Sequence, residues 1–259
     1  MLDIRIDKKT YPAIGGDEEC PVFRQFELQA AENEFVCLFG PSGCGKTTLL
    51  NIVAGLDEEF EGRIDHPKAV APGGIRTGYV FQEPRLLPWR SVRDNVRLAV
   101  MGDPGRMAKV DDILQLVGLS ALANAYPKHL SAGQARRAAL ARAFASEPDL
   151  LLMDEPFVSL DDPAAEVLHQ VLLQAWTAQP ATILFVTHNL SEAFLLADRV
   201  VLLEGQPAAI VADQHIALPR EGRSGSSEIL AMQSKFDTLR RGQTGPIPAV
   251  PGNDPRQSA

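Results

Sequence analysis

The sequence predicts an α/β fold with a parallel β-sheet core, an N-terminal antiparallel β part and an inserted α-helical subdomain. Short, continuously apolar runs recur along the chain, and each is typical of a strand that is buried on both faces. These runs alternate with helical patterns, as expected for a parallel sheet with helices on its faces. Residues from about 83–147 contain helical patterns but no strong strand pattern, which indicates an insertion between strands.

Composition and charge narrow the functional classes. The 259 residues suit one large domain or two small ones, and a hydrophobic content of 45% can form a sizeable core. The net charge of −8 argues against nucleic acid or an anionic lipid surface as the main partner. The N-terminus lacks the basic start and apolar block of a signal peptide, and no apolar run approaches the ~20 residues that span a bilayer. We therefore expect a cytoplasmic protein.

The N-terminal part predicts strands. Residues 1–11 alternate until Tyr11, which precedes Pro12 and a turn at residues 15–16. Residues 22–28 alternate again, and residues 35–39 form a continuous apolar run. We expect an antiparallel sheet that leads into a buried strand.

The remaining elements follow the same patterns. Gly55 would end a helix at residues 48–54, and a loop-rich connection around Gly62, Pro67 and residues 72–74 follows it. The other expected strands lie at residues 77–81, 149–155, 182–187 and 199–203, and the other expected helices at residues 94–101, 107–117, 132–145, 162–176 and 191–196. The main domain would span residues 1–218. In the extension 219–259, residues 227–240 suit an amphipathic helix and residues 241–259 suit disorder.

The stretch between the strand at 35–39 and the helix at 48–54 carries the phosphate-binding pattern G-x-x-x-x-G-K-[ST]. Its glycines let backbone N–H groups point at phosphate oxygens near the positive end of a helix dipole. Lys46 would reach the β- and γ-phosphates, and the Thr47 hydroxyl would bind Mg²⁺. A turn that binds nothing is the alternative, but the strand, spacing, lysine and threonine occur together. The candidate binding residues are Gly40, Pro41, Ser42, Gly43, Cys44, Gly45, Lys46, Thr47 and Thr48.

Three other strands end in polar side chains that suit a nucleotide, because ligands of such sheets bind at the carboxyl ends of strands. Asp154 can hold Mg²⁺, and Gln82 can sense the ion and an attacking water. Glu155 can polarise that water, and His188 can donate to the γ-phosphate as charge builds. Each residue alone is more often structural, but their order in one chain favours a nucleotide site.

A capped helix is expected after Leu130. Ser131 and Gln134 fit the S-x-x-Q capping box, so a helix begins here. Capping alone is the simpler interpretation. The small residues Ala132 and Gly133 and the exposed amides also allow this N-terminus to bind a phosphate.

Taken in order, these motifs resemble those of the ATP-binding subunits of ABC transporters. The phosphate loop, Gln82, the signature residues 130–134, the strand 150–155, residues 159–161 and His188 match over roughly residues 1–215. The resemblance implies a P-loop core of the RecA-like type. It also implies an ATPase that uses Mg²⁺, and a dimer of two copies that encloses two ATP molecules.

The resemblance assigns roles across that dimer. Each ATP would lie between one copy's phosphate loop and the other copy's Ser131, Gly133 and Gln134, and Asp161 would cross the interface. Tyr11 would stack on adenine, although packing at a sheet edge is an equally good explanation of this aromatic residue. The catalytic residues would be Glu155, His188, Lys46 and Gln82, and the Mg²⁺ residues Thr47, Gln82 and Asp154.

Three positions bear on how closely the chain follows the family. Ala132 stands where the signature usually has glycine, and its methyl group is expected to weaken activity without abolishing it. Asn33 stands at a turn position that is usually glycine, and asparagine tolerates positive φ. Cys44 is more simply a small filler of the loop than a reactive thiol. With Cys20 and Cys37 it forms neither a metal-binding pattern nor a disulfide framework.

The segment 82–92 is similar to one subgroup, the importers of nitrate, sulfonates, taurine and pyrimidine precursors. Residues 154–157 and the shortness of the C-terminal extension agree with it. In that subgroup the segment faces the membrane subunit, so residues 86–87 and Trp89 would be contact residues. Packing inside the helical insertion is the alternative.

The resemblance implies two membrane-spanning permease subunits, a second copy of this chain and, indirectly, a solute-binding protein as partners. The protein would lie at the cytoplasmic face of the cell membrane, and nucleic acid is not expected as a partner. ATP would close the dimer and switch the permease, and hydrolysis would reopen the dimer. An exporter subunit and a soluble, non-transport ABC ATPase remain alternatives. A small P-loop kinase would have no use for residues 130–134.

Overall fold

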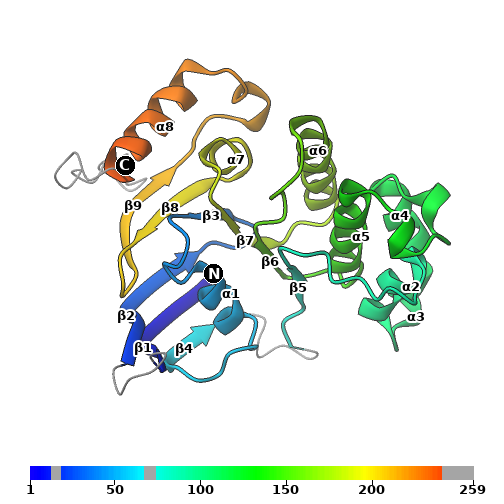
Figure 1. Cartoon of the computed structure of the whole chain (residues 1–259), viewed down its shortest axis with the longest axis horizontal. Coiled ribbons are helices and arrows are strands. Elements are labelled where there is room, and N and C mark those ends of the chain that lie inside the picture. The colour runs from blue at the N-terminus through cyan, green and yellow to red at the C-terminus, as the bar shows by residue number, and fades with distance from the viewer. Residues whose placement is uncertain (13–18, 67–73, 241–259) are drawn as a thin grey trace, which may run out of the picture.

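The computed structural model describes residues 1–12, 19–66 and 74–240, which form two β-sheets with helices around them (Figure 1). Three antiparallel strands have the order β2-β1-β4, and six strands have the order β5-β6-β7-β3-β8-β9. The predicted α/β class with an antiparallel N-terminal part is confirmed. The expected turn at 15–16, Pro67, residues 72–73 and the expected disorder of 241–259 lie outside the described residues.

The antiparallel sheet consists of β1 (Leu2–Pro12), β2 (Glu19–Ala30) and β4 (Glu61–Asp65). Leu2, Ile4 and Ile6 are buried on one face of β1, as the alternation predicts. β4 is not among the strands that the sequence predicts. Its residues EGRID are mostly exposed and polar, so pairing with β1, and not hydrophobicity, makes it a strand.

The central sheet consists of β3 (Phe35–Phe39), β5 (Thr77–Val80), β6 (Leu150–Asp154), β7 (Thr182–Thr187), β8 (Arg199–Glu204) and β9 (Ala209–His215). β3, β5, β6, β7 and β8 pair in parallel, whereas β9 pairs antiparallel with β8 at the edge. The sequence does not predict β9, because its side chains are exposed or half-buried along its whole length.

Two apolar cores lie on opposite faces of the central sheet. Phe35, Cys37 and Phe39 of β3 belong to an apolar core with α6 (Asp162–Ala178), α7 (Leu190–Leu196) and α8 (Ser227–Arg240). Val36 and Leu38 point the other way, into a core with α1 (Lys46–Val53) and the antiparallel sheet. The alternation of a strand thus divides one apolar run between two cores.

The helical segments of the insertion lie together at one side of the molecule (Figure 1). They pack around an apolar cluster of their own. They are α2 (Val92–Arg97), α3 (Pro104–Ala108), α4 (Val110–Leu116) and α5 (Ala132–Ala145). The expected helix at 94–101 is α2 followed by a 3-10 turn at Leu98–Val100, and the expected helix at 107–117 is divided between α3 and α4. The subdomain boundaries, about 83 and 147, stay a prediction.

The described part of the expected C-terminal extension, residues 219–240, packs against the core of the central sheet, and the division at about residue 218 stays a prediction. Ile229, Phe236 and Leu239 of α8 are buried against the core, and the Phe236 ring meets Phe194 of α7 edge-on with centroids 5.2 Å apart. Arg223 is also buried and donates to carbonyls at the end of α7, including that of Ala197 at 2.5 Å. In the part of the chain that the structure describes, no helix is both long and apolar enough to cross a bilayer.

Candidate nucleotide-binding site

The loop between β3 and α1 requires glycine for steric reasons. Gly45 caps α1 with a φ of +96°, and a Cβ there would lie 2.6 Å from Val22 Cγ1. A Cβ on Gly40 would lie 2.2 Å from the carbonyl oxygen of Leu203. Both distances are shorter than real contacts, so the loop keeps its course close to β2 and β8 only with glycine.

Lys46 lies back over its own loop. Its Nζ donates to the carbonyl oxygens of Gly40 at 2.8 Å and Pro41 at 2.7 Å, and the residue is only 5% exposed. Cys44 Sγ is 3.8 Å from the same Nζ, and Cys44 is buried as a small filler of the loop. The ammonium group is therefore held where anionic oxygens above the loop can reach it.

Thr47, Gln82 and Asp154 line one cavity of about 730 Å³ at the carboxyl ends of β5 and β6. Asp154 is buried, and this burial raises the pKa of its carboxyl group, while a hydrogen bond with Thr47 acts in the opposite direction. Hydroxyl, amide and carboxylate oxygens are hard donors of the kind that Mg²⁺ prefers. The three side chains suggested for Mg²⁺ thus share a cavity and fit that ion.

Glu155 and His188 meet at the ends of β6 and β7. His188 Nδ1 lies 3.1 Å from Glu155 Oε2, and the Glu155 amide donates to the Val186 carbonyl at 2.9 Å. The Glu155 side chain is 18% exposed and that of His188 is 55% exposed. The shielded carboxylate can orient a water molecule, and the accessible imidazole beside it can contact a phosphate oxygen.

Glu192 supports the His188 loop, a role that the sequence analysis misses. Thr187 Oγ1 donates to Glu192 Oε2 at 2.7 Å, and Asn189 Nδ2 donates to Glu192 Oε1 at 3.2 Å. Burial raises the pKa of the Glu192 carboxyl group. The signal was present in the sequence, because Asn189 and Glu192 have the spacing of a helix cap and its third residue.

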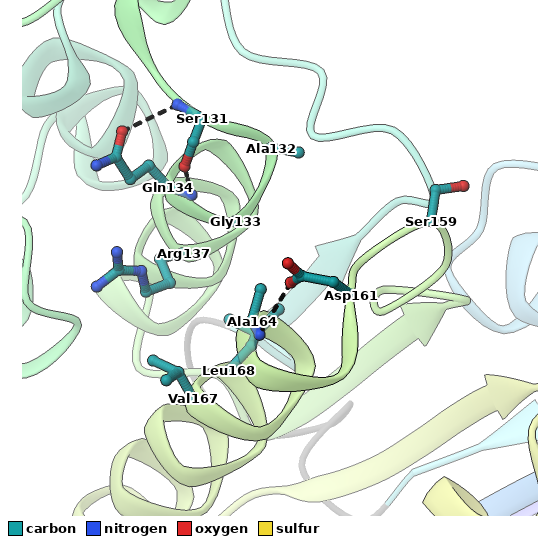
Figure 2. Close-up of a pocket in the computed structure, with 10 residues that line it drawn as sticks. All are labelled: Ser131, Ala132, Gly133, Gln134, Arg137, Ser159, Asp161, Ala164, Val167 and Leu168. Atoms are coloured by element: carbon teal, nitrogen blue, oxygen red, sulfur yellow. Dashed lines mark hydrogen bonds between the residues drawn. The ribbon is translucent and has the colours of Figure 1, made fainter.

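A second groove, of about 540 Å³, lies between the N-termini of α5 and α6 (Figure 2). Ser131 Oγ accepts from the Gln134 amide at 3.2 Å, and Gln134 Oε1 accepts from the Ser131 amide at 2.9 Å, so the capping box is present. Asp161 caps α6 by accepting from the Ala164 amide at 3.1 Å. Ala132 is exposed at the rim of this groove.

Within one chain, this groove and the cavity lined by Thr47, Gln82 and Asp154 are separate. The groove contains Ser131, Gly133, Gln134 and Asp161, whereas Thr47, Gln82 and Asp154 line the cavity described above. Of the residues lining the two, Ser159 alone is common to both. A single copy therefore does not bring its signature residues onto its own phosphate loop.

Tyr11 lies at the end of β1 with its ring partly covered. Its hydroxyl donates to Asp57 Oδ2 at 2.8 Å, and Lys9 Nζ lies 4.4 Å from the ring centroid. Lys9 is only 1% exposed and donates to Asp57 Oδ1 at 2.7 Å. Tyr11 remains 40% exposed, so edge packing and an open stacking surface are both present.

The structure also bears on the expectations for Asn33 and for the segment that contains Leu86 and Trp89. Asn33 adopts a φ of +60°, as a residue at a glycine-like turn position should. Trp89 is 69% exposed, whereas Leu86 packs against the helical cluster, so internal packing explains Leu86 but not Trp89.

A family model described as ABC transporter matches residues 23–158. The aliphatic sulfonates import ATP-binding protein SsuB 2 of Burkholderia lata is 43% identical over 89% of this chain and 83% of its own length. SsuB of Bacillus subtilis is 41% identical over 77% of this chain and 80% of its own length.

Solved structures are also similar. The dimeric, post-hydrolysis ATP-binding cassette MJ0796 bound to ADP and Pi superposes with a TM-score of 0.69 at 28% identity. The match covers 85% of this chain and 100% of that cassette. A second dimeric structure of the same bacterial ABC transporter cassette gives a TM-score of 0.71 over the same shares.

Proposed function

Because the chain belongs to the ABC transporter family and is one of its ATP-hydrolysing subunits, we propose that it energises the import of a solute such as a sulfonate, taurine, nitrate or a pyrimidine precursor. The name of the Burkholderia lata relative, at 43% identity over most of both chains, carries the importer part of this proposal. The partners would be two permease subunits and, indirectly, a solute-binding protein, at the cytoplasmic face of the cell membrane.

We assign the phosphates of ATP to the loop of Gly40–Thr48. The Lys46 ammonium would exchange its two loop carbonyls for β- and γ-phosphate oxygens, which are stronger acceptors because they are charged. Thr47, Asp154 and Gln82 would hold Mg²⁺, which would neutralise charge on those phosphates when bound.

Hydrolysis then depends on the pair at the ends of β6 and β7. Glu155 would hold and polarise the attacking water through one carboxylate oxygen while the other contacts His188. His188, which is accessible from solvent, would donate to the γ-phosphate as charge builds there. Glu155 and His188 directly follow the neighbouring strands β6 and β7, whose parallel register fixes where the two backbones emerge.

The separation of the groove at the α5 N-terminus from the cavity lined by Asp154 supports a dimer in which two copies share each ATP site. Ser131, Gly133 and Gln134 lie in a groove of their own, so they would complete the site of a second copy, with Asp161 crossing between the copies. The α5 N-terminus would offer backbone amides and a positive dipole end to the γ-phosphate of that copy.

The test is to purify the tagged chain from gently solubilised membranes in the presence of ATP and Mg²⁺ and to identify what accompanies it. A stoichiometric polytopic permease is expected. When the complex is placed in lipid vesicles, a sulfonate-loaded binding protein should stimulate ATP hydrolysis, whereas the empty binding protein should stimulate it less.

Two outcomes would contradict the proposal. A permease that moves its solute outward would indicate an exporter subunit, and copurification of soluble partners only, or of none, would favour a soluble ABC ATPase. The Glu155→Gln variant is the control, since it should copurify with the same permease and yet show no stimulation.

A further inference from the structure

Arg136 of α5 joins two loops that follow candidate catalytic residues. Its Nη1 donates to the Gln82 carbonyl at 3.1 Å and to the Pro156 carbonyl at 2.5 Å. Its Nη2 donates to the carbonyl of Val158. One guanidinium group thus connects the helical insertion, the end of β5 and the segment directly after Glu155.

The segment that Arg136 holds has an unfavourable backbone. Glu155 has a φ of +45° and Ser159 a φ of +62°, and both are non-glycine residues in the left-handed region. Such conformations persist only where surrounding contacts enforce them. Two of the three carbonyls that accept from Arg136, those of Pro156 and Val158, lie between Glu155 and Ser159, so the guanidinium acts within the strained segment.

The chemistry of this contact requires arginine. The planar guanidinium presents several donors in a fixed fork, whereas an ammonium group is a single point of attachment. Burial lowers the pKa of the Arg136 guanidinium, and its hydrogen bonds to the described residues all go to backbone carbonyls. The donors are free to serve backbone carbonyls.

We propose that Arg136 is a positioning residue for ATP hydrolysis, which holds the segment 156–158 and the Gln82 carbonyl so that the Glu155 carboxylate keeps its direction. This inference rests on the proposed function, because it presupposes that Glu155 orients the water. Arg136 lines the cavity that contains Thr47 and Asp154, but its guanidinium is occupied by carbonyls and donates to no atom of the phosphate loop, so its loss should lower kcat and leave ATP affinity nearly unchanged.

Arg142 provides a matched control on the same helix. It donates to the Arg85 carbonyl at 2.7 Å and to the Pro84 carbonyl at 2.9 Å. Arg142 therefore fastens α5 to the loop after Gln82 but makes none of the contacts with residues 156–158. Like Arg136, it is half-buried and burial lowers the pKa of its guanidinium.

The experiment compares full-length Arg136→Ala, Arg136→Lys and Arg142→Ala for kcat and for the KM of ATP. We expect Arg136→Ala to lose about tenfold or more in kcat with KM changed by less than about twofold. Arg142→Ala should retain most of its kcat. Arg136→Lys should recover only part of the loss, and added guanidinium ion at low millimolar concentration should partly rescue Arg136→Ala but not Glu155→Gln.

A second measurement separates positioning from effects on the signature groove, since α5 also carries Ser131. In a Glu155→Gln background, Arg136→Ala should still form the ATP-dependent dimer, as measured by size-exclusion chromatography. Loss of that dimer would overturn the positioning role. If Arg136→Ala does not fold, Arg136→Lys decides, because an unchanged kcat in that variant would contradict the inference.

The outcomes separate the role of Arg136 from that of the proposed catalytic site. If the unchanged chain hydrolyses ATP, Glu155→Gln does not, and Arg136→Ala remains fully active, then only the role of Arg136 falls. Equal kcat losses in Arg136→Ala and Arg142→Ala would also overturn it. If Glu155→Gln retains full activity, the proposed catalytic site itself is wrong.

Discussion

His188 Nδ1 lies 3.1 Å from Glu155 Oε2, although the two residues are 33 positions apart in the chain. The parallel register of β6 and β7, which pairs Asp154 with Val186, creates this proximity. Both residues extend just beyond the paired strands, so their side chains meet at the same edge of the sheet.

Replacing Glu155 by glutamine should abolish most ATP hydrolysis and preserve ATP binding. The amide is nearly isosteric but cannot accept a proton from water, and general-base groups commonly contribute about 10²–10⁴-fold. Steady-state phosphate release and equilibrium ATP titration measure the two effects. Glu166→Gln, an exposed carboxylate on α6, is the matched control. Brisk turnover by Glu155→Gln would remove Glu155 from its role.

Lys46→Ala should lose affinity for ATP. The buried ammonium sits over the loop carbonyls at 2.7 and 2.8 Å, and its removal leaves the β- and γ-phosphates without that cation. Isothermal titration with a non-hydrolysable ATP analogue and Mg²⁺ is the measurement. Lys109→Ala, an exposed lysine paired with Glu147, should bind as the unchanged chain does. Unchanged affinity of Lys46→Ala would contradict the assignment of the loop.

Tyr11→Ala should weaken ATP binding if the ring stacks on adenine, since stacking of a base on an aromatic ring contributes about 1–3 kcal/mol. Tyr11→Phe keeps the ring and loses only the hydrogen bond to Asp57, so its affinity should stay near normal. Titrations with ATP and with ribose triphosphate, which has no base, give the comparison. If Tyr11→Ala changes thermal stability but not the preference for ATP, the ring serves only the sheet edge.

Acid should destabilise the fold through His169. This residue is 9% exposed, lies edge-on to Phe157 with ring centroids 4.4 Å apart, and burial lowers its pKa to about 4 from 6.5. Below pH 6.5 the His169 side chain becomes protonated in the unfolded chain, whereas in the folded chain it stays neutral until the pH approaches 4. Stability is therefore fully present above that pH and is lost progressively toward pH 4.

The size of this effect can be measured with a single substitution. At about pH 5 the low pKa of His169 should have reduced the free energy of unfolding by about 2 kcal/mol. His169→Leu should therefore flatten the pH dependence of the free energy of unfolding between about pH 7.5 and about pH 5. Urea unfolding at both pH values gives the free energies. His129→Leu, at an exposed histidine, should leave the slope unchanged. An unaltered slope in His169→Leu would show that the pKa of His169 is not depressed.

The sequence by itself determined the features that depend on local order. The G-x-x-x-x-G-K-[ST] loop, the Ser131–Gln134 capping box and the apolar strands ending in Asp154 and Thr187 are each written within a few consecutive residues. Their physical causes are short-range, namely steric freedom at glycine, hydrogen bonding within one helical turn, and continuous burial. These features therefore predicted both the parallel sheet and which strand ends carry polar groups.

Tertiary structure alone decided what depends on distant partners. β4 and β9 are strands because a neighbouring strand supplies their hydrogen bonds, since their own side chains are largely exposed. Arg136 reaches carbonyls up to 54 positions away, and nothing in its local sequence marks it. Backbone carbonyls are alike in every residue, so a contact made through them leaves no pattern in the sequence, and only the packing of α5 against both loops reveals it.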